Sequence, residues 1–306
     1  MIIRKIKSVW RRLLGKLEKP KNKWTKEKLS ENLKRGYRAC HNRDLNMDSP
    51  EFFTEKLQWY KINYRTKDME RAVDKYSFKS YITEKLGEGF VVPCYNAWTD
   101  VKSFARDWES LPNSFVLKST LQSDGRNINI IKDKASVDKK QLFKEVKQWF
   151  KVKNTLINSY CSAYHNATPR ILAEQYVAWL GTQLYDYKFF CFNGEPYCTY
   201  AAKNHFRGGA NSIISFYDLE WNKMDVRYGK HENADIPKPK HFEEMIRICK
   251  VLSKDFPFVR VDFFDTEDKF YVAELTFYPG GGNTPYSPLD FDKLLGDMFV
   301  LPTANR

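Results

Sequence analysis

Two carboxylates near the C-terminal end of the chain have a spacing that could hold a divalent cation. Residues 256–284, FPFVRVDFFDTEDKFYVAELTFYPGGGNT, predict two strands joined by a DTED turn and followed by a glycine-rich loop. Because side chains alternate along a strand, Arg260 and Asp262 share one face of the first strand. Antiparallel pairing should bring Glu274 within reach of Asp262, with Thr276 two residues further along the same side.

The second strand of this hairpin, KFYVAEL, is expected to place Phe270 and Val272 on the same face as Glu274. Magnesium suits such a site, because it binds one or two carboxylates together with phosphate oxygens of a substrate. Arg260 could add a planar fork of donors for a phosphate. A solvent-exposed hairpin with a surface ion pair would show the same pattern and is the competing interpretation.

The order of these residues resembles a known metal-binding hairpin. An R-x-D strand, a turn, an E-x-T strand and then P-G-G-G is similar to the hairpin of the ATP-grasp ligases, a superfamily that includes D-alanine:D-alanine ligase. The phrases VRVDFF, AELTFYP and DYKFFCFNG resemble more closely the TupA-like ATP-grasp family, named for teichuronopeptide synthesis and found among bacterial surface-polysaccharide genes. The resemblance runs in order from about Ser49 to Asp290. It implies an α+β ATP-grasp fold, in which two α+β subdomains grip the nucleotide, preceded by a mostly helical N-terminal region.

Other stretches take nucleotide-binding roles through this resemblance. LPNSFVLKSTLQSDGRNINIIKDK predicts two strands around a polar loop, and Lys118 at the end of FVLK is expected to meet the nucleotide phosphates. The loop would be a flap whose backbone amides cradle phosphate, formed by Ser123, Asp124, Gly125 and Arg126. Relatives resemble K-x-N/T-H-G-S-G at this place, so the flap of this chain, with one glycine and an added carboxylate, departs from the family pattern.

The strand in PRILAEQYVAW is expected to end at a hinge between the two subdomains. The resemblance implies that Glu174 and the backbone of Gln175, Tyr176 and Val177 meet the adenine there. Because these residues lie between Lys118 and the carboxylate hairpin, their order along the chain is the one that the fold requires.

A second hairpin turns at the Asn-Gly pair of residues 193–194, a strong turn signal. Asp186 and Lys188 share a face of its first strand. By resemblance Asp186 contacts ribose and Lys188 contacts phosphate, while Lys203 and Arg207 follow the second strand as candidates for the γ-phosphate or an acyl phosphate. The catalytic candidates are therefore Arg260, Lys203 and Arg207.

Helical patterns dominate the region before these strands. SPEFFTEKLQWYKINY predicts a helix with Ser49 as its N-cap, and MERAVDKYSFKSYITEKL predicts another that ends at the glycine of position 87 or 89. Asp74, Lys75 and Lys79 on the latter fit D-K-x-x-x-[KR], which precedes the nucleotide domain in ATP-grasp proteins. A solvated charged helix face would show the same spacing.

Most of the net charge of +13 lies at the N-terminus, where residues 1–28 contribute +9. Apolar and basic residues alternate at helical spacing, so we predict a basic amphipathic helix over 1–19 and a linker over 20–28. This pattern is typical of a helix on an anionic membrane surface, contacted through residues 1–17. Packing on the protein's own body or on a second copy in a homodimer is the alternative. The body shows no nucleic-acid module, so we expect no nucleic-acid partner.

Three larger regions follow: a helical region over 29–110, ATP-grasp subdomain A over 111–178, and subdomain B with the metal-binding hairpin over 179–306. The six cysteines form no C-x-x-C pair, and the N-terminus lacks the apolar core of a secretory signal. We therefore expect a cytoplasmic protein, associated peripherally with the inner face of the cell membrane.

The resemblance implies an ATP-dependent carboxylate-amine ligase that uses ATP and Mg²⁺ and proceeds through an acyl phosphate. Its family association suggests that an amino acid or amine is joined to a uronic acid of a bacterial capsule or surface polysaccharide, or of an acidic lipid-linked precursor. Residues 280–284 could shape the acceptor side of the cleft. The alternatives are a sugar kinase, a glycosyltransferase-like enzyme, or a catalytically degenerate module that binds nucleotide or glycan.

Overall fold

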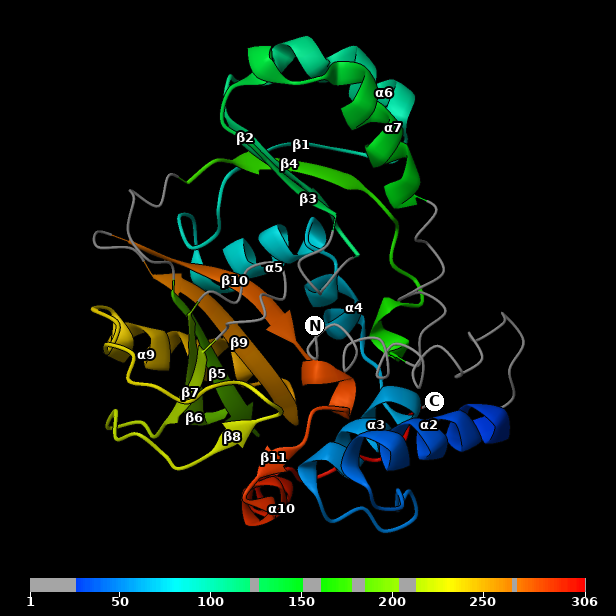
Figure 1. Ribbon diagram of the computed structural model, residues 1–306, viewed down its shortest axis with the longest axis vertical. Coiled ribbons are helices and arrows are strands. Elements are labelled where there is room, and N and C mark those ends of the chain that lie inside the picture. The colour runs from blue at the N-terminus through cyan, green and yellow to red at the C-terminus, as the bar shows by residue number, and fades with distance from the viewer. Residues whose placement is uncertain are drawn as a thin grey trace, which may run out of the picture.

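Two antiparallel sheets, with helices between and around them, form the body of the protein (Figure 1). The structure is a computed structural model, and it describes residues 26–121, 127–150, 161–177, 185–203, 213–265 and 269–305. The predicted basic helix of residues 1–19, the flap residues 123–126 and Arg207 lie outside the described residues. Within the described residues, no helix is long and apolar enough to cross a bilayer.

The smaller sheet has four strands in the order β1-β4-β2-β3. Its strands are β1 (Cys94–Trp98), β2 (Phe115–Ser119), β3 (Ile128–Ile131) and β4 (Ile171–Gln175). Helices α6 (Val101–Asp107) and α7 (Lys139–Trp149) cover one face (Figure 1). Phe115 and Leu117 point into a core under these helices, so the alternation along β2 turns Lys118 toward the opposite face.

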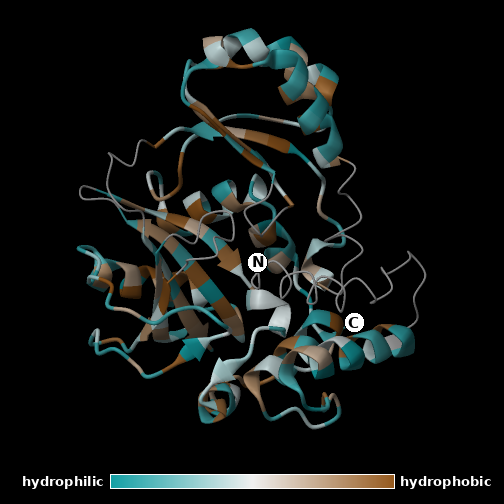
Figure 2. Ribbon diagram, viewed as in Figure 1, coloured by the Kyte–Doolittle hydropathy of each residue, from teal (hydrophilic) through white to brown (hydrophobic). Residues whose placement is uncertain are grey.

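The larger sheet has five strands in the order β10-β9-β5-β6-β7. Its strands are β5 (Tyr185–Phe192), β6 (Glu195–Lys203), β7 (Ile213–Tyr217), β9 (Phe258–Asp265) and β10 (Phe270–Thr276). Helix α9 (Phe242–Ser253) packs on one face, where Phe242 contacts Phe189. The strands of both sheets are rich in hydrophobic residues, as Figure 2 shows, because the sheets contribute most of the buried core.

The predicted carboxylate hairpin is confirmed, with one correction. Glu274 pairs with Asp262 across β10 and β9, as expected. Val272, however, pairs with the buried Phe263, and a β-bulge at Ala273 shifts the register before Glu274. The extra residue reverses the alternation, so Glu274 lies on the opposite face from Val272 rather than on the same face.

The other face of the large sheet is covered at one end by α3 (Phe53–Asn63), which inserts Phe53 against Phe258 of β9. The helix that was predicted to have Ser49 as its N-cap begins later, at Phe53. The Glu55 carboxylate accepts hydrogen bonds from the backbone N–H groups of residues 51 and 52, which takes over the capping role expected of Ser49. Helix α2 (Lys26–His41) also begins inside the segment predicted as a linker.

The single helix predicted over residues 69–86 is two helices, α4 (Lys67–Val73) and α5 (Ser77–Leu86). We call residues 74–76 between them the joint. The chain turns there because the Asp74 carboxylate accepts hydrogen bonds from the N–H groups of Tyr76 and Ser77, at 2.8 and 3.3 Å, and so starts a new helix. Of the two predicted stops, at positions 87 and 89, the helix ends at Gly87.

The remaining strands and the last helix lie in the lower part of the molecule in Figure 1. They are β8 (Arg227–Tyr228), which pairs with β11 (Tyr286–Ser287), and the C-terminal helix α10 (Leu289–Met298). Short 3₁₀ turns lie at Trp108–Ser110, Lys134–Ser136, Ser162–Tyr164 and Pro279–Gly282. Helix α10 packs beside α3. The glycine-rich turn Pro279–Gly282 follows soon after β10, so the carboxylate hairpin positions it.

Candidate functional site

Charged side chains gather on the face of the large sheet that α9 does not cover. One row of register partners runs across four strands, from Glu274 to Asp262, Lys188 and Tyr200. Partners in register share a face, and residues two positions away along a strand join them. We call the face that carries Asp186, Lys188, Arg260, Asp262 and Glu274 the ionic face.

Asp262 lies at the centre of the ionic face, and its side chain is only 1% exposed. Arg260 grips it with a fork, from Nε to Oδ1 at 2.6 Å and from Nη2 to Oδ2 at 2.6 Å, and Lys188 Nζ donates to Oδ2 at 2.7 Å. Burial raises the pKa of Asp262, but the two cations more than offset it and hold the pKa below its usual value. Asp262 is therefore a buried anion shared by two buried cations.

The residues present fit a magnesium ion that is bound largely by substrate. Among the described residues, Asp262 Oδ1 accepts one hydrogen bond, from Arg260, so it keeps a lone pair, and the Glu274 side chain is 22% exposed. The hydroxyl of Thr276 accepts a hydrogen bond from Arg260 at 3.2 Å, which ties it to the same group. No three His, Cys, Asp or Glu residues in the described part of the chain could hold a metal by themselves. Two carboxylates that need phosphate oxygens to complete a shell are the usual magnesium arrangement.

Asp186 differs from its neighbours, because its Oδ1 is buried and has no hydrogen-bond partner in the described residues. Burial raises the pKa of its carboxyl, although the nearby Lys188 opposes that shift. A buried acceptor without a donor is costly in a native protein, so it indicates a place for a ligand donor. The ribose hydroxyls expected at Asp186 would supply such donors.

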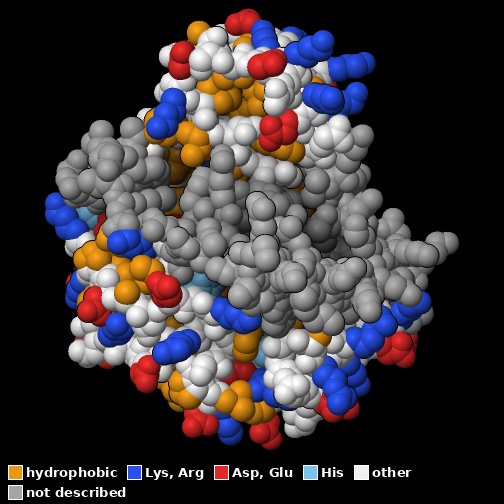
Figure 3. Space-filling model, viewed as in Figure 1, with side chains coloured by type: hydrophobic (Ala, Val, Ile, Leu, Met, Phe, Trp, Pro, Cys, Tyr) orange, Lys and Arg blue, Asp and Glu red, His pale blue; other side chains and the backbone are white. Residues whose placement is uncertain are grey.

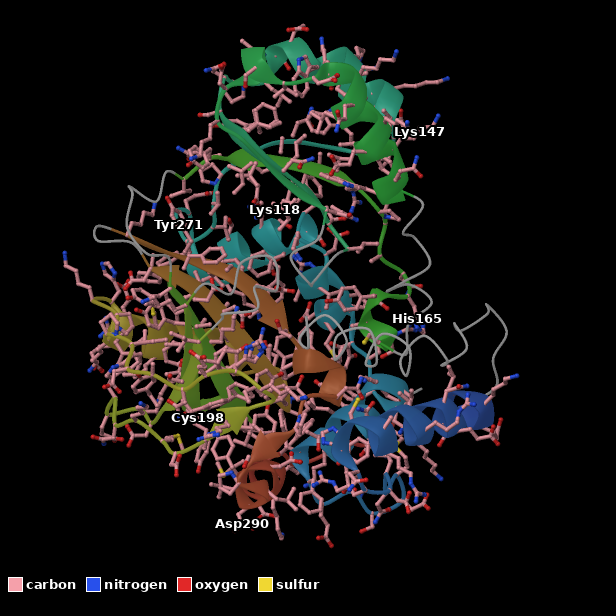
Figure 4. All side chains as sticks on the ribbon, in the orientation of Figure 1. Lys118, Lys147, His165, Cys198, Tyr271 and Asp290 are labelled. Atoms are coloured by element: carbon pink, nitrogen blue, oxygen red, sulfur yellow. The ribbon has the colours of Figure 1, made fainter. Side chains whose placement is uncertain are left out.

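A second ionic group lies on the face of the small sheet that points away from α6 and α7. The Glu174 carboxylate, 6% exposed, pairs with Lys118 of β2 and with Lys79 of α5, the latter at 2.5 Å. Burial raises the pKa of Glu174, and the two lysines lower it below its usual value. Figure 4 shows Lys118 under the small sheet and above α5. Glu174 thus holds the two lysines in place, a contact that the expected adenine role did not include.

Lys79 is a site residue that sequence reasoning did not select, although it is the last residue of the D-K-x-x-x-K pattern. The first residue of the pattern, Asp74, forms an ion pair with Arg170 at 2.9 Å, just before β4. The second, Lys75, lies 3.8 Å from Glu274 on the ionic face. The three residues therefore connect the joint and α5 to both sheets.

The first amide of the predicted hinge after β4 is occupied. The N–H of Gln175 donates to the carbonyl of Pro93 at 2.9 Å. Tyr176 and Val177 follow outside the strand and are partly buried. The backbone amides of Tyr176 and Val177 therefore remain as the candidates to bind the edge of an adenine.

The structure does not bring Lys203 onto the ionic face. Lys203 pairs with Tyr185, and this pair alternates with Asp186 and Ala202, so its side chain starts from the α9 side of the sheet. Of the three catalytic candidates, only Arg260 lies on the ionic face, since Arg207 is outside the described residues.

The glycine-rich turn is held from the N-terminal helices. Gln58 Nε2 donates to the carbonyls of Gly281 and Gly282 at 3.1 and 2.9 Å, and the buried ammonium of Lys61 donates to Gly281. Gly280 has φ +56°, and a Cβ there would lie 2.4 Å from the Tyr228 hydroxyl, so only glycine fits. No local pattern reveals Gln58 and Lys61 as partners of this turn, because they lie more than 200 residues away in the sequence.

Two sheets whose ionic groups face each other, with the joint and α5 between them, are the two halves of an ATP-grasp fold. A family model described as TupA-like ATPgrasp matches residues 55–300. The chain therefore belongs to the TupA-like ATP-grasp family, which confirms the resemblance and the fold class. No curated protein sequence matches the chain significantly.

Several solved structures are similar to the chain at low identity. D-alanine-D-alanine ligase from Helicobacter pylori is 15% identical with a TM-score of 0.42, over 75% of this chain and 63% of that chain. The biotin carboxylase complex with β,γ-ATP from Campylobacter jejuni is 11% identical with a TM-score of 0.44, over 77% and 48%. The biotin carboxylase domain of 2-oxoglutarate carboxylase from Hydrogenobacter thermophilus, with MgADP, is 14% identical with a TM-score of 0.40, over 68% and 40%. The chain thus covers 63% or less of each of these solved chains.

Proposed function

We propose that the protein is an ATP-dependent ligase that joins an amine or amino acid to the carboxylate of a uronic acid. The acceptor would belong to a bacterial capsule or surface polysaccharide, or to its lipid-linked precursor. One observation carries the proposal: Asp262 and Glu274 pair directly across a hairpin, beside Arg260 and Lys188. Membership of the TupA-like ATP-grasp family supports ATP as the second substrate.

The proposed chemistry follows from the charges. A carboxylate oxygen is a poor leaving group, so ATP would first phosphorylate it to an acyl phosphate, and an amine would then displace phosphate to form the amide. Arg260 and Lys188 would hold the anions together in a cleft with little water. Mg²⁺, when bound at Asp262 and Glu274, would neutralise phosphate charge. Lys118 of the small sheet and Lys79 of α5 would approach the phosphates from the other side.

The test measures ADP release by the full-length protein with ATP, Mg²⁺, a panel of uronic acids and a panel of amino acids. Hydroxylamine replaces the amine in a parallel series, because it traps an acyl phosphate as a hydroxamate. We expect ADP release that requires both a carboxylate and an amine, with loss of at least about 100-fold in Asp262→Asn. Hydroxamate formed with a uronate would identify the activated group directly.

The other outcomes point to the alternatives. ADP released together with a phosphorylated sugar would indicate a sugar kinase. Transfer of a sugar from a nucleotide sugar would indicate a glycosyltransferase-like enzyme. ATP binding without ADP release, whatever the acceptor, would indicate a degenerate binding module and would contradict the ligase proposal.

We also propose that residues 1–17 attach the protein to the anionic inner face of the cell membrane, next to an acidic, lipid-linked substrate. The support is the composition of the segment, where basic residues worth about 1 kcal/mol each near anionic lipid alternate with apolar ones. We expect the protein to pellet with vesicles that contain phosphatidylglycerol, and a chain without residues 1–20 to stay in the supernatant. Equal pelleting of both would contradict attachment, and a monomer-dimer difference between them would favour a homodimer contact instead.

A further inference from the structure

Lys61 of α3 is a buried cation that the proposed chemistry does not use. The residue is 3% exposed, and its ammonium donates to the side-chain oxygen of Gln58 at 2.8 Å and to the carbonyl of Gly281. Both of these partners are neutral. Among the described residues, only the thiols of Cys40 and Cys161 act on its charge. A lysine is almost never buried in a folded protein unless an anion pairs with it.

The surroundings of Lys61 leave its positive charge without a counter-charge. Burial lowers the pKa of Lys61, and the two thiols oppose this shift without cancelling it. Thiols are mostly neutral at pH 7, so neither of them replaces a carboxylate. Neutral hydrogen bonds compensate only part of the cost of burying an ion. An anionic ligand would therefore be stabilised beside this ammonium.

The space beside Gly281 gives such a ligand access to Lys61. A Cβ on Gly281 would lie 3.7 Å from Lys61 Nζ and 3.4 Å from Asn283 Nδ2, so two donors flank the position that glycine leaves empty. Gly281 and Asn283 are both partly exposed. Asn283 Oδ1 accepts a hydrogen bond from Gln58 at 3.3 Å, which leaves Nδ2 to face a ligand. An ammonium and an amide on one side of the turn suit the two oxygens of a carboxylate.

We propose that Lys61 and Asn283 form a subsite that binds a carboxylate of a substrate other than the carboxylate that is activated. The inference rests on the proposed function, in which the activated carboxylate lies at the ionic face, beside the metal and the phosphates. The additional carboxylate comes either from an amino acid that supplies the amine or from a neighbouring uronic acid of the acceptor. It neutralises Lys61, whereas a substrate without it leaves the ammonium unpaired.

The first measurement is the melting temperature of the full-length protein with Mg²⁺ and a non-hydrolysable ATP analogue, so that no turnover occurs. Amino acids are compared with their carboxamides, and digalacturonate is compared with galacturonate. We expect the compound with the additional carboxylate to raise the melting temperature more than its partner does. The pair of compounds that shows this difference identifies the source of the carboxylate.

Lys61→Met removes the charge and keeps the approximate length of the side chain. We expect the difference within that pair to disappear, and in turnover the KM for the carboxylate-bearing substrate to rise about tenfold with little change in kcat. Lys56→Met is the matched control, because Lys56 lies on the same helix and donates to the carbonyls of Gly296 and Phe299 at 2.8 and 2.9 Å. This control should keep the wild-type preference. A purely structural role of Lys61 would affect both members of the pair equally.

Asn283→Asp tests the same subsite with the opposite change in charge. It keeps the oxygen that accepts from Gln58 and replaces the amide nitrogen with a carboxylate oxygen, so the chain carries its own anion next to Lys61. Without ligand, we expect a melting temperature about 2 °C or more above that of the wild type, because the buried cation is now paired. The preference for the additional carboxylate should be lost, since the subsite is filled. An unchanged preference in Asn283→Asp would overturn the subsite.

The outcomes separate the subsite from the proposed function. If ADP release requires a carboxylate and an amine but Lys61→Met keeps the wild-type preference, the subsite is wrong and the ligase proposal stands. If no ADP is released but the preference is present in the wild type and absent in Lys61→Met, the subsite stands and the ligase proposal fails. A wild type that responds equally to both members of every pair contradicts the subsite.

Discussion

Replacing Asp262 with asparagine is expected to destabilise the protein and to abolish its dependence on a metal. The substitution keeps the shape of the side chain but leaves Arg260 and Lys188, both buried, without their shared anion. Breaking a buried ion pair on one side costs about 3–5 kcal/mol, because an uncompensated charge stays inside the protein. Urea unfolding should show this loss, and calorimetry should show that Mg²⁺ no longer strengthens ATP binding.

Glu274→Gln is the matched control for this variant, since it removes the other carboxylate of the pair. Glu274 is partly exposed and has one long ion contact, so we expect a stability loss below about 1 kcal/mol. The metal dependence should nevertheless be lost. If Mg²⁺ strengthens ATP binding by Glu274→Gln as much as in the wild type, the metal site has been assigned incorrectly. If Asp262→Asn is as stable as the wild type, the buried ion group of Arg260, Lys188 and Asp262 has been assigned incorrectly.

Glu174→Gln is expected to have the second largest effect, on the other sheet. The variant leaves Lys79 and Lys118 close together with no anion between them. We expect a loss of about 2–4 kcal/mol at pH 7, from an unpaired buried charge, together with weaker ATP binding because the two lysines are no longer held in place. Unfolding curves and ATP titrations at pH 7 measure the two effects.

The difference in stability between the wild type and Glu174→Gln should depend on pH, and the direction of that dependence follows from the pKa of Glu174. The pKa of Glu174 is lower in the folded protein than in an unfolded chain, where a glutamate has a pKa of about 4.3. Its stabilisation is therefore complete above that value and is lost as the pH falls through the lower pKa of the folded state. The gap in stability between wild type and Glu174→Gln should narrow below about pH 4. A gap that stays constant down to pH 3 would show that the glutamate is not held ionised by the lysines.

Membership of the family and the main carboxylate pair could be predicted from the sequence. Side chains alternate along a strand because of local backbone geometry, so Arg260 and Asp262 had to share a face wherever the strand lay. The Asn-Gly turn of residues 193–194 ends its strand in the same local way. The order of Lys118, Glu174 and the hairpin along the chain then identified the family.

Only the tertiary structure decided which charges meet. The bulge at Ala273 reverses the alternation that predicted Glu274 beside Val272, and the break at Asp74 separates two helices where the periodicity predicted one. The ion pairs from Lys79 to Glu174 and from Lys75 to Glu274 join residues about 95 and 200 positions apart. Sequence patterns report local backbone preference, whereas a long-range ion pair depends on how whole elements pack, so the residues of the pairs were visible in the sequence but their partners were not.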